Sequence, residues 1–265
     1  MWWRASEGGL ETGRRRGEGT AAARAAMSRL LQGGAGSSRY AGHVPTTLLE
    51  KALLGSSSAI LALASPREAH LVGVVGETTG AAALRRLLFR MEKNPVGRTI
   101  LQDRPQITSK VLPLHSLHKL PADSFGAAYA RFLERNAFDP DDRSPVRFVD
   151  DPDLAYVMLR YRQIHDLWHV LYDLPPTFMG EVALKWLEAA QTGLPMCALG
   201  AMAGGIRLKP RQRSAIAQHV LPWALRHAMR GPDLMSVYYE RELPRSLEDV
   251  RNELGIEVLP RKRIQ

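Results

Sequence analysis

The chain is poor in cysteine, with Cys197 alone among 265 residues. A single thiol excludes a disulfide framework and every multi-cysteine zinc or iron–sulfur site. Long apolar runs are also missing, because Gln191, Thr192, Pro195 and four glycines interrupt the longest uncharged stretch, residues 189–206. We therefore expect no transmembrane helix. Hydrophobic residues still make up 45% of the chain, enough to bury a core and too many for a disordered protein.

Negative charge is the next shortage. The chain has 36 Lys and Arg against 27 Asp and Glu, which gives a formal net charge of +9. Residues 1–39 contain seven arginines and three glutamates, so +4 of this excess lies at the N-terminus. The same stretch is rich in Ala, Gly and Ser and has no stable apolar period. This composition predicts an N-terminal extension with a transit segment rather than folded structure.

Met27 indicates where the transit segment begins. No acidic residue follows Met27 until Glu50, and mitochondrial presequences are poor in acid. We expect residues 27 to about 40 to belong to a mitochondrial presequence and residues 1–26 to be an upstream extension. The alternative is a disordered basic tail.

The remaining charge of +5 is unexceptional for residues 40–265. Basic side chains cluster at residues 207–213 and 261–263, and neither cluster has interleaved aromatic residues. We therefore expect no nucleic-acid partner. A solvated face and contact with an anionic membrane surface are the two alternatives for these clusters.

Helical patterns dominate residues 40–265. Apolar residues recur at helical spacing between capping residues or prolines, with Thr78 or Thr79 expected to cap the second helix. Residues 70–75 fit a strand or a helix end equally well. The fold class predicted is mostly α, a single domain of packed helices. The expected helices span residues 48–64, 82–91, 121–136, 154–171, 177–193, 212–230, 232–241 and 246–254.

One cluster of residues carries recognisable chemistry. His165, Asp166 and His169 lie on the fourth of these helices at azimuths of about 0°, 100° and 40°, within one arc of its surface. Two imidazoles at i and i+4 can bind one divalent cation. Glu181 begins the next helix, and a short antiparallel connection would bring it back to His169. The sequence therefore predicts a metal site on two consecutive helices, with a structural or pH-sensing histidine pair as the alternative.

Two histidines and two carboxylates suit zinc, iron, manganese or cobalt, and donor type alone does not choose among them; zinc is the metal we expect. Arg162 shares the helix face, where it could bind an anionic group of a substrate or pair with Asp166. Tyr161 and Tyr172 are expected to pack, and Cys197 to act as a small hydrophobe. Residues 189–206 fit a core segment, the lining of a lipid-binding channel or a shallow membrane contact.

The motif and its surroundings resemble a known family. His165-Asp166-x-x-His169, followed after eleven residues by Glu181, is similar to the signature of the mitochondrial ubiquinone-biosynthesis family known as coenzyme-Q-biosynthesis protein four. The resemblance covers about residues 40–256. Further landmarks that look like this family are Gly76-Glu77-Thr78-Thr79-Gly80, Arg147-Phe148-Val149-Asp150-Asp151, Gly193-Leu194-Pro195-Met196-Cys197 and Tyr238-Tyr239-Glu240-Arg241.

The resemblance implies a fold, a place and an activity. It implies an α-helical protein on the matrix side of the mitochondrial inner membrane, within the multi-protein coenzyme Q synthesis complex. It further implies a divalent metal at His165, Asp166, His169 and Glu181. The expected reaction is removal of the C1 carboxyl group from 4-hydroxy-3-methoxy-5-polyprenylbenzoate, a carbon–carbon lyase activity. The resemblance assigns no catalytic residue beyond the metal motif.

Two other functions compete with this expectation. One is a non-catalytic organiser that binds prenylated intermediates and holds the biosynthetic enzymes together. The other is a phosphohydrolase of the histidine–aspartate type, which needs a further histidine, His115 or His118, and a downstream aspartate such as Asp233. The position of Glu181 disfavours the phosphohydrolase.

Overall fold

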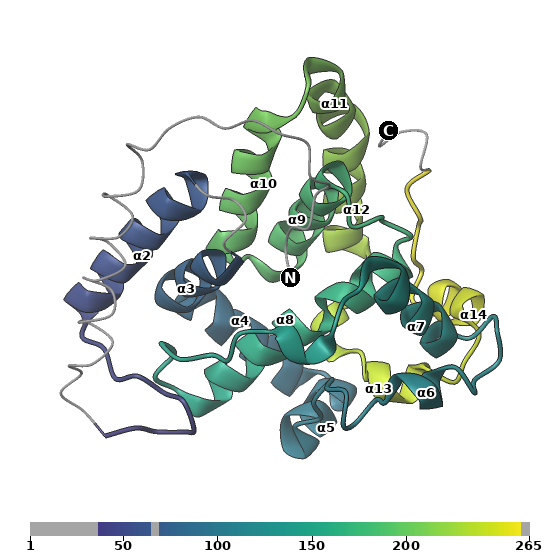
Figure 1. Ribbon diagram of the computed structural model, residues 1–265, viewed down its shortest axis with the longest axis horizontal. Helices are drawn as coiled ribbons and strands as arrows, with labels where there is room; N and C mark the ends of the chain where they lie inside the picture. The colour runs from purple at the N-terminus through teal and green to yellow at the C-terminus, as the bar shows by residue number, and fades with distance from the viewer. Residues whose placement is uncertain (1–36, 65–68, 261–265) are drawn as a thin grey trace.

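The computed structural model describes residues 37–64 and 69–260 (Figure 1). Nearly all of the predicted N-terminal extension and transit segment, and the basic residues 261–263, lie outside these ranges. The boundary between residues 39 and 40 therefore stays a prediction. In the described ranges the chain is helical and has no β-strand, only an isolated bridge between Ser124 and Ser246. The mostly α prediction is confirmed.

The helices follow one another with short connections. Their bounds are α2 (Leu48–Ala64), α3 (Ala69–Thr79), α4 (Ala81–Lys93), α5 (Pro95–Asp103), α6 (Leu114–Leu117), α7 (Phe125–Asn136), α8 (Pro152–Leu171), α9 (Phe178–Thr192), α10 (Pro195–Arg207), α11 (Pro210–Ala215), α12 (Leu221–Arg230), α13 (Tyr239–Glu242) and α14 (Leu247–Glu253). Short 3-10 turns cover Pro140–Asp142 and Leu234–Ser236, and one π-helical turn covers Ile216–Val220.

Local signals explain the helix ends near the predicted site. The Asp151 carboxylate accepts the N–H groups of Asp153 and Leu154 and starts α8 at Pro152, two residues before the predicted start. Thr177 accepts the N–H of Gly180 and starts α9. Gly193, with φ of 67°, ends α9 in the left-handed conformation that glycine adopts without strain.

Other predicted helix ends are wrong. Thr78 and Thr79 do not cap a helix, because they form the last turn of α3 and donate their hydroxyls to the carbonyls of Val74 and Val75. Residues 70–75 are therefore helical. The helix predicted at 232–241 is broken into a 3-10 turn and the short α13. The helix predicted at 212–230 starts earlier, at Pro210, and contains a π-helical turn.

Helix α8 lies at the centre of the molecule. It packs against α4 and α7 (Figure 1). Almost all its residues from Leu154 to Leu171 are buried. A helix that is buried on every side normally lacks polar residues. Apart from its tyrosines, this one buries five ionisable side chains, and each needs a partner to offset the loss of water. Those side chains are Arg160, Arg162, His165, Asp166 and His169.

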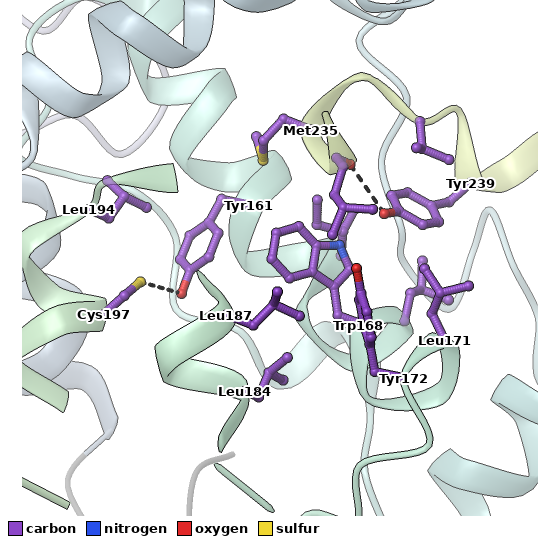
Figure 2. Packing of buried hydrophobic residues seen from close by; sticks show 14 of the residues in the cluster. Tyr161, Trp168, Leu171, Tyr172, Leu184, Leu187, Leu194, Cys197, Met235 and Tyr239 are labelled. Carbon is purple, nitrogen blue, oxygen red and sulfur yellow. Dashed lines mark hydrogen bonds between the residues drawn. The ribbon is translucent and has the colours of Figure 1, made fainter. Parts of the chain in front are cut away.

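The core beneath the predicted site is built on Trp168, whose indole is fully buried (Figure 2). Leu184 and Leu187 approach it from α9, and Met235 from the turn before α13. Tyr239 donates its hydroxyl to the carbonyl of Leu234 and so ties that turn to the same core. Close packing on one side of α8 leaves little freedom for the polar side chains one turn away.

The segment after α14 is anchored on α12 by a buried histidine. The backbone N–H of Glu257 donates to Nε2 of His227 at 3.0 Å, and Nδ1 of His227 lies 3.1 Å from the carbonyl of Trp223. The Trp223 indole donates to the carbonyl of Glu257 at 2.7 Å. A nitrogen that accepts an N–H carries no proton, so the His227 ring is neutral in this arrangement.

Burial lowers the pKa of His227 below its usual range. The unfolded chain therefore binds a proton at higher pH than the folded chain does, and the free energy of unfolding should fall as the pH drops below about 6.5. We expect His227→Gln, which cannot titrate, to show a smaller loss of stability between pH 7.5 and pH 5.5. Urea unfolding of both proteins at the two pH values measures this. If the free energy of unfolding falls equally in the two proteins, His227 is not the group responsible for the pH dependence.

Candidate metal centre

Two buried histidines lie one turn apart on α8. The rings of His165 and His169 meet edge to face, with centroids 4.8 Å apart. Their exposed fractions are 5% and 1%. Phe132 of α7 stacks on the His169 ring at a centroid distance of 5.5 Å. The i, i+4 spacing has therefore put both imidazoles on one face of the helix, as predicted.

Glu181 reaches these histidines across a tight turn. Asp173 takes a left-handed backbone conformation, with φ of 52°, just beyond the end of α8, and the chain reverses into α9. Glu181 lies in the first turn of α9. Its Oε1 is 3.1 Å from Nε2 of His169, and its Oε2 is 3.6 Å from Nε2 of His165. The predicted return of Glu181 to the histidines is confirmed.

These three side chains could hold a metal ion. One donor atom from each of His165, His169 and Glu181 lies within 4.8 Å of the others. Nδ1 of His169 is 2.9 Å from the carbonyl of Leu174, so it carries the proton and Nε2 presents a lone pair. The Nε2 atom of His169 and the Oε2 atom of Glu181 are both buried, and neither has a hydrogen-bond partner in the described part of the chain. A cation between them would satisfy both atoms.

The ionisation of Glu181 suits the same role. Burial alone would raise the pKa of this carboxyl, but His169 and His165 outweigh burial and hold the pKa well below its usual range. The carboxylate is therefore charged at neutral pH, as a metal ligand must be.

Asp166, the fourth predicted ligand, lies beside this group and not within it. Its carboxylate forms an ion pair with Arg143, which precedes α8 in the chain. Burial raises the pKa of Asp166, but Arg143, His165 and His169 together outweigh burial and hold the pKa below its usual value. The structure thus brings three of the four expected ligands together. A metal-binding role for Asp166 stays a prediction.

A buried carboxylate that sequence reasoning missed stands behind His165. Glu188 accepts from Nδ1 of His165 at 2.6 Å, from the Tyr161 hydroxyl at 2.8 Å and from the ammonium of Lys185. Burial alone would raise the pKa of Glu188, but Lys185 and His165 lower it to about 2. The spacing of Glu181, Lys185 and Glu188 along α9 is i, i+4, i+7. That shared helix face is the signal that could have revealed them.

The neighbouring aromatic residues and the cysteine are only partly as predicted. Tyr161 does more than pack, because its hydroxyl also lies 3.1 Å from Sγ of Cys197 (Figure 2). Burial raises the pKa of the Cys197 thiol to about 12, so the thiol stays protonated and is a poor nucleophile. Tyr172 packs edge to face on Trp223 and His227, as expected.

Arg162 pairs with a different residue from the one the helix spacing suggested. Its guanidinium donates to Glu77 at 2.7 Å and to the carbonyl of Gly73 at 2.9 Å, both on α3. The alternative of a pair between Arg162 and Asp166 is wrong, because Arg143 takes that place. A long-range contact has replaced the local one.

An apolar cavity opens beside Glu181. It has a volume of about 140 Å³ and lies between α2, α3, α9 and α10. Glu181 and Lys185 are in its wall, and most of the remaining wall is apolar. Part of the segment 189–206, which was predicted as a possible channel lining, contributes residues of α10 to the wall of this cavity. Those α10 residues are Met196, Leu199, Gly200, Ala203 and Gly204.

A polar hollow lies next to His165. It has a volume of about 70 Å³, and its wall includes Arg143 and Arg162. A larger hollow of about 260 Å³ shares Arg162. Val72 and Met196 belong to the walls of both the apolar cavity and the small polar hollow. The donor group therefore has apolar surface on one side and cationic side chains on the other.

The phosphohydrolase arrangement finds no support. His118 lies 2.7 Å from Glu134, and Asp233 lies 2.8 Å from Arg90, both near the surface. Within the residues that the structure covers, the group of metal donors contains neither of them, nor His115.

Comparison with known proteins identifies the family and supports the fold. The sequence model of a family described as "Coenzyme Q (ubiquinone) biosynthesis protein Coq4" matches residues 40–260. The human "Ubiquinone biosynthesis protein COQ4 homolog, mitochondrial" is 46% identical over 221 residues, 83% of each chain. The Drosophila ananassae protein of that name is 47% identical over 210 residues, 79% of each chain. A crystal structure of a Nostoc punctiforme protein described as belonging to ubiquinone biosynthesis has a TM-score of 0.62 at 21% identity. It covers 78% of this chain and 98% of its own, and so supports the fold.

Proposed function

Since this chain belongs to the Coq4 family of coenzyme Q (ubiquinone) biosynthesis proteins, we propose that it is a metal-dependent carboxy-lyase. Its substrate is 4-hydroxy-3-methoxy-5-polyprenylbenzoate. The reaction breaks the bond between ring carbon 1 and the carboxyl carbon, places a proton on the ring carbon and releases carbon dioxide. The observation that carries the proposal is the buried donor group of His165, His169 and Glu181 between the apolar cavity and the polar hollow.

The apolar cavity suits the polyprenyl tail. Its wall is formed largely by aliphatic residues of α2, α3, α9 and α10, and each methylene buried there contributes about 0.8 kcal/mol. Glu181 lies in the same wall, so a tail in the cavity brings an attached ring towards the donor group. The cavity thereby selects for a lipid-linked benzoate over a free one.

The polar hollow suits the benzoate carboxylate. Arg143 and Arg162 are in its wall beside His165, and both guanidinium groups are held by ion pairs that fix their position. We assign Arg162 to substrate binding on this basis. Removing a buried carboxylate as neutral carbon dioxide also relieves the cost of keeping its charge away from water.

The metal, for which we propose zinc, would be held by His165, His169 and Glu181, with Asp166 as the predicted fourth ligand. When bound, it supplies a Lewis acid that stabilises negative charge on a carboxylate or phenolate oxygen. The protein keeps the donor side chains buried, and Phe132 covers one face of the His169 ring.

We place the protein at the matrix face of the mitochondrial inner membrane, with other coenzyme Q biosynthesis proteins as partners in a multi-subunit complex. Relatives are named mitochondrial. None of the helices within residues 37–64 and 69–260 could span a bilayer. The side chains of Leu199, Met202 and Ile206 on α10 are 45%, 49% and 76% exposed. The basic cluster at residues 207–213 follows directly. Exposed apolar side chains next to basic ones suit an anionic lipid surface.

The test is a reaction with purified full-length protein. We expect it to contain a divalent metal and to release labelled carbon dioxide from carboxyl-labelled 4-hydroxy-3-methoxy-5-polyprenylbenzoate in detergent. Chelation should stop the release and zinc should restore it. A folded protein that binds the prenylated benzoate without releasing carbon dioxide, and still assembles with its partners, would favour the non-catalytic organiser.

A further inference from the structure

We propose that Glu188, held by Lys185 and Tyr161, positions His165 for the metal. These are positioning residues, since they act on the metal through the imidazole. The inference rests on the proposed metal centre and goes beyond the ligand motif, because none of the three belongs to that motif. The contact that carries it is the 2.6 Å hydrogen bond between Nδ1 of His165 and Glu188.

The two ligand histidines are supported in different ways. Nδ1 of His169 donates to a backbone carbonyl, that of Leu174, at 2.9 Å. Nδ1 of His165 instead meets a carboxylate. Both bonds direct the proton to Nδ1, so that in each ring Nε2 is the nitrogen that would bind a cation. A carboxylate acceptor also makes the imidazole a stronger donor to a metal, and losing such a partner typically weakens metal affinity about 10- to 100-fold.

The position of Glu188 is itself determined by its neighbours. The carboxylate is fully buried. One oxygen faces His165, and the other accepts from the Tyr161 hydroxyl at 2.8 Å and from Lys185. Lys185 also donates to the Tyr161 oxygen at 2.9 Å. These contacts hold the Glu188 carboxylate in one orientation. The hydrogen bond from Nδ1 then fixes the orientation of the His165 ring.

Lys185 supplies the buried counter-charge of Glu188. Its exposed fraction is 2%, although a lysine in the wall of an apolar cavity is costly to bury. Its ammonium forms an ion pair with Glu188. The cation therefore makes it possible to keep a charged carboxylate in a fully buried position behind His165.

The experiment measures Zn²⁺ affinity by competition with a chromogenic chelator, and records the visible absorption of the Co²⁺-loaded protein. Glu188→Gln keeps an acceptor but removes its charge, and we expect about 10- to 100-fold weaker Zn²⁺ binding. The double variant Lys185→Met with Glu188→Met removes the acceptor without leaving an unpaired buried charge. It should bind Zn²⁺ more weakly still and change the Co²⁺ spectrum. Tyr161→Phe keeps the charges of Lys185 and Glu188 and should weaken Zn²⁺ binding only a few-fold.

Glu240→Gln is the matched control. Glu240 also pairs with a buried cation on α8, Arg160, but does not touch His165. Its loss should cost stability and leave Zn²⁺ affinity and the Co²⁺ spectrum unchanged. If every folded Glu188 variant and Tyr161→Phe bind Zn²⁺ within twofold of the wild type, the inference is overturned. A folded wild type that binds no Zn²⁺ would overturn both this inference and the metal centre. A wild type that binds Zn²⁺ but releases no carbon dioxide rejects only the carboxy-lyase.

Discussion

Replacing Glu181 by glutamine is expected to abolish both zinc binding and carbon dioxide release while leaving the fold intact. The amide keeps the size of the carboxylate but loses the charge, so Zn²⁺ affinity should fall by more than about 100-fold, beyond the loss typical of a residue that only supports a ligand. The change can even stabilise the metal-free protein. The new NH₂ group can donate to Nε2 of His169, which has no hydrogen-bond partner in the described structure, and one such bond is worth about 1 kcal/mol.

Thermal unfolding with and without Zn²⁺ measures both halves of this prediction. The wild type should unfold at a higher temperature with Zn²⁺, since a ligand that binds only the folded state stabilises it. Glu181→Gln should show no such shift. The matched control is Glu134→Gln, which removes a carboxylate 2.7 Å from an exposed histidine, His118, and should keep the shift. A Zn²⁺ shift in Glu181→Gln equal to that of the wild type would refute the metal assignment.

Gly180→Ala is expected to damage the fold and the site together. A Cβ atom at this position would lie 1.9 Å from the carbonyl oxygen of Pro175, a backbone atom that cannot move aside cheaply. Overpacking of this kind costs about 1–3 kcal/mol. The backbone must shift in the turn that places Glu181, the next residue. We therefore expect a Tm lower by several degrees and weaker Zn²⁺ binding in the same protein.

Gly205→Ala separates the steric effect from the loss of a glycine. A Cβ atom at Gly205 would meet nothing within 4 Å, and the residue lies inside α10. Alanine in a helix interior should stabilise the protein by about 0.5–1 kcal/mol. Thermal unfolding and Zn²⁺ titration of both variants provide the comparison. A Gly180→Ala protein with the Tm and Zn²⁺ affinity of the wild type would show that the turn does not hold Glu181 in place.

Sequence reasoning located the helices that matter because their ends carry local signals. Asp151 and Thr177 cap α8 and α9 with their own side chains, and Gly193 ends α9 through its φ. Such signals lie within a few residues of the helix end. Where the signal was ambiguous the prediction failed. Thr78 and Thr79 have the chemistry of caps, but in α3 their hydroxyls bond back to carbonyls one turn earlier.

The donor group was predictable to the extent that it follows helix geometry. His165 and His169 share a face because they are four residues apart, and a short turn returns Glu181 to them. Asp166 satisfied the same geometric rule, but Arg143 was free to reach it from outside the helix. Helix spacing limits which side chains can meet within one helix. It says nothing about a side chain that arrives from another segment.

The sequence by itself determined the mostly α class, the two helices of the site and the chemistry of its donors, since these depend on residue type and on spacing within a dozen residues. Tertiary structure alone decided that Glu188 stands behind His165, that Arg162 turns to Glu77, and that an apolar cavity meets Glu181. Each of these joins residues on different helices. Their contacts depend on how buried surfaces pack and on where a buried charge finds its counter-charge, which spacing along one helix does not encode.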